Sequence, residues 1–158
     1  MNDTAQLIRE LKLNYGVIQM QLEGLTHTDT LLQLPFRGNC LNWVLGHIVD
    51  SRAAMVQLAG IEPLWDDADY ALYRRESEPI FDGDGALELH RIMADLTVSQ
   101  ERLLSRLPQL TEEKLFAGVE EGERTVYERL SFSSWHETYH TGQLEVLRQL
   151  AGKDDKVI

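Results

Sequence analysis

The sequence predicts an all-α fold, a four-helix bundle formed by a single domain over residues 1–158. Four stretches repeat apolar residues at spacings of three, four and seven, which is the pattern of a helix with one buried side. No stretch shows a convincing strand-like alternation. A chain of this length has the size of one domain, and four helices of about 20 residues each can bury their apolar stripes against one another.

The four helices are expected over residues 4–25, 40–59, 86–107 and 125–152. Pro108 ends the third, because a proline ring cannot continue a helix. The fourth begins at Thr125-Val-Tyr-Glu128, which has the spacing of a capping box, and it reaches Gly152, a suitable C-terminal cap. These signals predict where the last two helices begin and end.

Two connections between the helices are long. Residues 60–85 contain four aromatic residues, and a connection of this length either takes part in function or packs across the end of the bundle as a cover. Residues 108–124 are acidic, and we expect a solvated loop there.

Composition limits the functions that the chain can have. Its net charge of −11 would repel phosphate backbones, so we expect no nucleic-acid partner. No apolar run approaches the roughly 18 residues that cross a bilayer, and the N-terminus has no apolar segment of a signal peptide. The single cysteine, Cys40, cannot form an internal disulfide and favours a reducing compartment. We therefore expect a soluble cytoplasmic protein with no membrane partner.

Two of the five histidines form a candidate metal site. His136 and His140 are four residues apart, so they lie on one helix face and could bind a single ion. We expect that face to point into the bundle beside apolar side chains such as Leu147. The alternative, two buried histidines each satisfied by hydrogen bonds, is about equally compatible with the spacing.

A third ligand would come from another helix. His47 is the only other histidine inside a strong helical segment and off its outer face, whereas His27 and His90 are expected at the surface or periphery. Three protein ligands with open positions are the layout of a catalytic metal site. The alternative is a histidine at the edge of the core, bonded to a backbone carbonyl.

The segment His136-Glu137-Thr138-Tyr139-His140 also matches the H-E-x-x-H pattern of zinc peptidases. The longer peptidase pattern needs glycine and histidine where this chain has Gln143 and Val146, and no edge strand is expected that could pair with a peptide. We therefore reject the peptidase hypothesis. Glu137 could still act as a general base, as an outer partner of a histidine, as a bond across helices, or simply face solvent.

The segments "LNWVLGHIVDS" (41–51) and "TVYERLSFSSWHETYHTGQLEVLRQL" (125–150) resemble the DinB superfamily, with weaker support from residues 22–35. The resemblance implies up-down-down-up topology, a homodimer, and zinc, nickel or iron held by His47, His136 and His140. It also implies a reaction with a small molecule, for related members include S-transferases and isomerases that use low-molecular-weight thiols.

Two functions follow as hypotheses. The first is a metal-dependent thiol S-transferase or hydrolase, because an ion on three neutral imidazoles lowers the pKa of a bound water or thiol. Trp43, Tyr139 and Gln143 are the candidates to line its substrate pocket. The second is a non-catalytic, metal-binding, stress-related protein that acts as a dimer. A third possibility has no metal, with the histidines bonded to one another and to the backbone.

Overall fold

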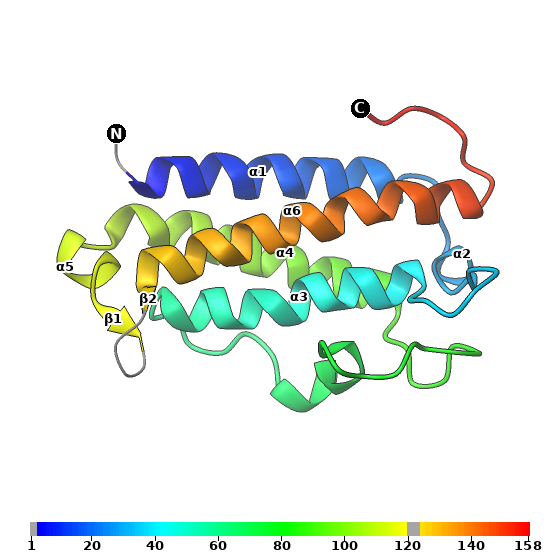
Figure 1. The fold of residues 1–158 in the computed structure, drawn as a ribbon, viewed down its shortest axis with the longest axis horizontal. Helices are drawn as coiled ribbons and strands as arrows, with labels where there is room; N and C mark the ends of the chain where they lie inside the picture. Colours follow the sequence, from blue (N-terminus) through cyan, green and yellow to red (C-terminus); the bar gives the residue numbers. More distant parts are fainter. Residues whose placement is uncertain (1–2, 120–123) are drawn as a thin grey trace.

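Four long helices make up most of the computed structural model, which describes residues 3–119 and 124–158 (Figure 1). They are α1 (Asp3–Leu22), α3 (Leu41–Leu58), α4 (Leu89–Arg106) and α6 (Val126–Leu150). The shorter elements are α2 (His27–Thr30), the 3₁₀ helices η1 (Asp67–Tyr73) and η2 (Leu107–Gln109), α5 (Glu112–Leu115), and the strands β1 (Gly118–Val119) and β2 (Arg124–Thr125).

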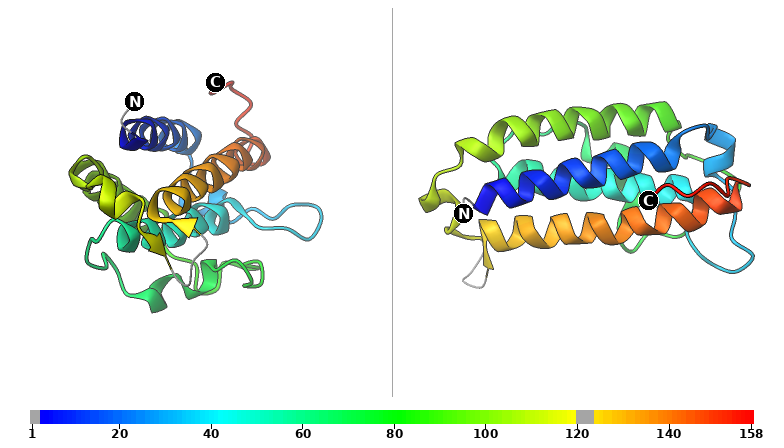
Figure 2. Two further views of the ribbon diagram at one scale, coloured as in Figure 1. Left: turned by 60° about the vertical axis from the view of Figure 1, so that its left-hand side comes forward. Right: turned by 90° about the horizontal axis from the view of Figure 1, so that it is seen from above.

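The four long helices run up, down, down and up. In Figure 1, α1 and α6 run in one direction, whereas α3 and α4 run in the other. The α6 helix packs against both α1 and α3, and α4 packs against α3 and α1 (Figure 2). Both the all-α class and the predicted topology are therefore confirmed.

The helix ends follow the signals in the sequence. The backbone N–H and the hydroxyl of Thr125 both donate to the Glu128 carboxylate, while the Glu128 N–H donates to the Thr125 hydroxyl, which completes the capping box that starts α6. Pro108 lies in η2, directly after α4. Gly152 has a φ of +78°, the left-handed conformation that ends helices and that glycine adopts without strain.

The core consists of two apolar clusters with a polar layer between them. One cluster includes Ile48 and Leu144, and the other includes Leu7 and Leu130. Between them, every long helix contributes buried polar side chains, namely Asn14, Arg52, Ser99, Gln100, Ser134, Glu137 and Thr141. Such a layer is stable only when its members bond to one another or to the backbone.

The connection between α3 and α4 is more than a cover over the end of the bundle. Because these two helices are parallel, the chain must return along the whole bundle between them. On its way, η1 packs on α3 and buries Tyr70 and Tyr73 completely. The Tyr73 hydroxyl donates to the Asn42 side chain at 2.9 Å and accepts from the Leu87 N–H at 2.6 Å.

The segment after α4 differs from the solvated loop that we expected over residues 108–124. It contains α5, whose Leu115 is buried in the core, and a short hairpin in which Gly118 pairs with Thr125. Burial of the Leu115 side chain stabilises this segment against the bundle, although most of its neighbours in the sequence are acidic or polar. Residues 120–123 lie outside the described part of the chain. Within the described part, no helix is long and apolar enough to cross a membrane.

Candidate metal centre

His47 is held in place in the middle of α3. A Cβ at the preceding Gly46 would overlap the ring of Tyr73, so only glycine lets η1 approach α3 this closely. That approach brings the Tyr73 carbonyl within 2.6 Å of His47 Nδ1, which donates to it. Trp43, one turn earlier on α3, stacks on the imidazole with ring centroids 4.9 Å apart. The hydrogen bond leaves Nε2 as the nitrogen with a free lone pair.

His136 and His140 lie one turn apart on α6, with their Nε2 atoms separated by 3.0 Å. His140 Nδ1 donates to Gln143 Oε1 at 2.7 Å, which leaves its Nε2 as an acceptor. The expectation that this face points into the bundle is wrong, because the core line of α6 runs through Leu130, Ser134 and Leu144. The two histidines are half-buried at the margin of that line, facing the groove between α6 and α3.

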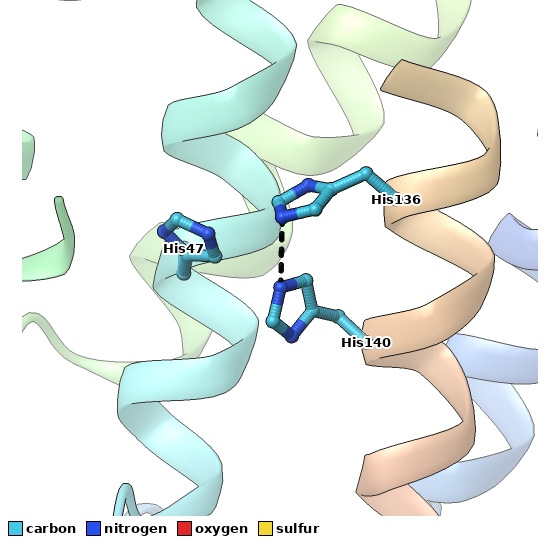
Figure 3. Close-up of side chains that lie close together, drawn as sticks. All are labelled: His47, His136 and His140. Carbon is cyan, nitrogen blue, oxygen red and sulfur yellow. Dashed lines mark hydrogen bonds between the residues drawn. The ribbon is translucent and has the colours of Figure 1, made fainter. Parts of the chain in front are cut away.

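The three imidazoles converge across this groove (Figure 3). One nitrogen from each lies within 4.8 Å of the others, and the ring of His47 is 5.2 Å from that of His136 and 4.8 Å from that of His140. Two histidine nitrogens on one ion, each bonded at about 2.0–2.1 Å, lie about 2.9–3.4 Å apart. The 3.0 Å between the Nε2 atoms of His136 and His140 fits that requirement. The nitrogens of the whole cluster are up to 4.8 Å apart, so binding of an ion requires the imidazoles to move slightly toward one another.

The protonation of the cluster suits a cation. Burial lowers the pKa of His140 to about 4, against the opposing effect of the Gln143 hydrogen bond. Burial also lowers the pKa of His136, and the nearby positive charge of Arg75 acts in the same direction. Both rings are therefore neutral at pH 7, as metal ligands must be. Without an ion, His136 Nε2–H donates a hydrogen bond to His140 Nε2. An ion bound to His136 Nε2 would have to displace this proton.

A pocket of about 790 Å³ opens directly on the three histidines. The sequence candidates Trp43, Tyr139 and Gln143 all contribute to its wall. The remaining wall is mostly apolar and includes Leu34, Phe36, Val44, Val146 and Leu147. A cavity of this size accommodates a small organic molecule, and the histidine nitrogens lie among the polar groups of its wall, with Asn39, Arg75 and Gln143.

Glu137 lies away from the pocket. It is 2% exposed, and both of its oxygens accept hydrogen bonds from Arg52 on α3, at 2.8 and 2.9 Å. Arg52 also donates to the Leu96 carbonyl and to Ser99 on α4. Of the four environments considered for Glu137, the structure has the bond across helices. With both oxygens occupied there, the geometry gives no support to a general base of the peptidase kind.

The other two histidines lie outside the cluster. His90 is exposed on α4, as expected. His27 is less exposed than expected, because it begins α2 and its Nδ1 accepts the Leu89 N–H at 3.3 Å.

Two contributors to the site were missed from the sequence. The Tyr73 carbonyl orients His47, yet a backbone atom has no sequence signature, and the glycine beside His47 was the only hint of a close approach. Arg75 lines the pocket from the connection between α3 and α4, where no periodic pattern predicts the path of the chain.

Comparison with known proteins agrees with this fold. The sequence model of the DinB superfamily matches residues 10–144. The crystal structure of a conserved protein from Enterococcus faecalis is similar over 97% of this chain and 99% of that chain, with a TM-score of 0.75 and 19% sequence identity. At that identity the likeness concerns the fold alone. No curated protein is significantly similar in sequence.

Proposed function

The chain belongs to the DinB superfamily, and on that basis we propose that it is a metal-dependent enzyme acting on a small molecule. His47, His136 and His140 would hold the divalent ion. The observation that carries the proposal is the convergence of three histidine nitrogens from two helices at the wall of a largely apolar pocket. Zinc, nickel and iron all accept imidazole ligands, so each is a candidate.

The residues around the histidines hold the ligands in register. Tyr73 through its carbonyl and Gln143 through its amide oxygen each bind an Nδ1–H, so the Nε2 lone pairs of His47 and His140 face the cluster. Trp43 limits rotation of the His47 ring by stacking on it. A divalent ion on such ligands would lower the pKa of a bound water or thiol, which suits a hydrolase or a thiol S-transferase.

Metal content tests the site directly. Protein purified without a nickel column should contain close to one ion per chain by elemental analysis. His47→Ala and His140→Ala should each lose the ion. Loss of a residue that only hydrogen-bonds to a ligand lowers metal affinity about 10–100-fold, and loss of the ligand itself should lower it further. His90→Ala, an exposed histidine on α4, is the matched control and should keep its metal. Unchanged metal in His47→Ala would exclude it as the third ligand.

Activity separates the enzyme from the non-catalytic alternative. The metal-loaded protein is incubated with monochlorobimane and one of several low-molecular-weight thiols, with metal-stripped protein as the control. Faster formation of the conjugate with metal supports a thiol S-transferase. If no thiol gives turnover above the control and simple esters and amides are not hydrolysed, the alternative is favoured: a metal-binding, stress-related interaction protein.

We also propose that the chain forms a homodimer through the outer face of α6. Phe132, Trp135, Tyr139 and Val146 are at least half exposed there at helical spacing, and successive aromatic rings are 5.7 and 6.2 Å apart. An apolar face of this kind is typical of interaction sites. Sedimentation equilibrium should give a dimer for the wild type and a monomer for Trp135→Lys. The control is Leu13→Lys, an exposed leucine on α1, which should remain dimeric. A monomeric wild type would refute the proposal.

A further inference from the structure

The groove between α3 and α6 continues past the histidines into a second cavity. The first pocket extends toward the C-terminal half of α6, whereas this one, of about 670 Å³, extends toward its N-terminal half. His47, His136 and Arg75 line both. The candidate metal site therefore lies between two cavities, and a ligand could occupy both while passing the three histidine nitrogens.

The second cavity is basic in a chain that is strongly acidic overall. Arg75, Arg124 and Arg129 line it, against one carboxylate, Asp50. The protein carries a net charge of −11, so three arginines around one cavity are a local reversal of charge. Among the acids of residues 3–119 and 124–158, Glu128 also lies near Arg124, and its carboxylate already accepts hydrogen bonds from Thr125 in the capping box of α6.

Among the described residues, none forms an ion pair with these three guanidinium groups. Within residues 3–119 and 124–158, Arg75 and Arg129 form no hydrogen bond or ion pair, and Arg124 contacts the Phe132 ring at 5.8 Å. Arg74 differs, because its guanidinium binds Asp67. A guanidinium presents a planar set of N–H donors that match a carboxylate or phosphate, so arginines gathered around a cavity favour an anion.

We infer that the substrate carries an anionic group, a carboxylate or a phosphate, which Arg75, Arg124 and Arg129 bind while the apolar part lies in the first pocket. The bond that reacts would then lie between these two parts, beside the histidines. The inference rests on the proposed function for the position of the reaction. The arginine cavity itself does not depend on whether an ion is bound.

The test uses full-length protein as purified, with its metal content measured first, and three probes that share a benzene ring. Phenylacetate carries a carboxylate, phenylphosphonate a phosphonate, and benzyl alcohol no charge. Isothermal titration calorimetry should show that Arg75→Gln and Arg129→Gln each weaken the binding of an anionic probe roughly tenfold, the size of a lost charged hydrogen bond. Arg102→Gln, an exposed arginine on α4, removes the same charge elsewhere and should bind like the wild type. Benzyl alcohol should bind equally to all four proteins.

The outcomes separate this inference from the proposed function. If Arg75→Gln and Arg129→Gln keep normal metal content but bind both anionic probes as tightly as the wild type, the anion site is refuted and the metal site stands. The same holds if neither anionic probe binds the wild type more tightly than benzyl alcohol does. If the wild type holds no metal yet shows the arginine dependence, the anion site stands and the proposed function fails. The anionic probe that binds more tightly shows whether the group is a carboxylate or a phosphate.

Discussion

Replacement of Glu137 by alanine is expected to destabilise the fold more than it affects the metal. Arg52 and Glu137 have side-chain exposures of 0% and 2%. Water therefore cannot solvate the guanidinium of Arg52 when the Glu137 carboxylate is removed. Loss of one member of such a buried pair costs about 3–5 kcal/mol. That is a large part of the 5–15 kcal/mol that holds typical domains folded, and it corresponds to a fall in Tm of about 6–20 °C for a chain of this size.

Urea and thermal unfolding of the metal-stripped proteins give this quantity without a contribution from metal binding. Glu101→Ala, an exposed glutamate on α4, is the control and should change stability by no more than about 0.5 kcal/mol. The double variant Arg52→Met, Glu137→Leu removes both charges and should recover most of the loss, because apolar replacements of a buried ion pair are often neutral or stabilising.

A second measurement, metal content, completes the test. Glu137→Ala should still bind its ion at a temperature where it is folded, since its carboxylate bonds to Arg52 and not to a histidine. If Glu137→Ala keeps wild-type stability and metal but loses an activity that the wild type has, the reasoning is refuted and Glu137 acts in catalysis.

Three further predictions concern the histidines. Gly46→Ala should destabilise the protein by about 1–3 kcal/mol and weaken metal binding, because the added Cβ displaces Tyr73 and with it the carbonyl bound to His47; unfolding and metal titration check both effects. Gln143→Leu should lower metal affinity about 10–100-fold with little change in Tm, because His140 loses its Nδ1 partner; equal affinity would contradict that role. In metal-free protein, the imidazole of His140 should titrate near its lowered pKa of about 4, as followed by NMR. Because the unfolded chain protonates His140 more readily than the folded protein does, the free energy of unfolding should fall as the pH falls from 6.5 to about 4. An NMR titration midpoint at or above 6.5 would contradict the burial of His140 in the cluster.

Local sequence determined the four long helices and the pairing of two of the three candidate ligands. The capping box at Thr125 and the stop at Pro108 depend on residues within one turn, so they could be read directly and agree with the structure. The closeness of His136 and His140 follows from helix geometry alone. His47 was chosen as their partner because it is the only other histidine inside a strong helical segment and off its outer face, and the family resemblance implied the same residue. That α3 and α6 are neighbours follows from no local rule.

Only the tertiary structure decided which way these side chains face and what holds them. The bond between Arg52 and Glu137 joins residues 85 positions apart, and its existence depends on which helices are neighbours. His136 faces a groove because a different side of α6 is buried in the core. That buried side includes polar residues such as Ser134 and Glu137, so a search for apolar periodicity does not identify it. The Tyr73 carbonyl and Arg75 reach the site from a connection without periodicity. Helical spacing acts over a few residues, whereas a site between helices depends on packing over the whole chain.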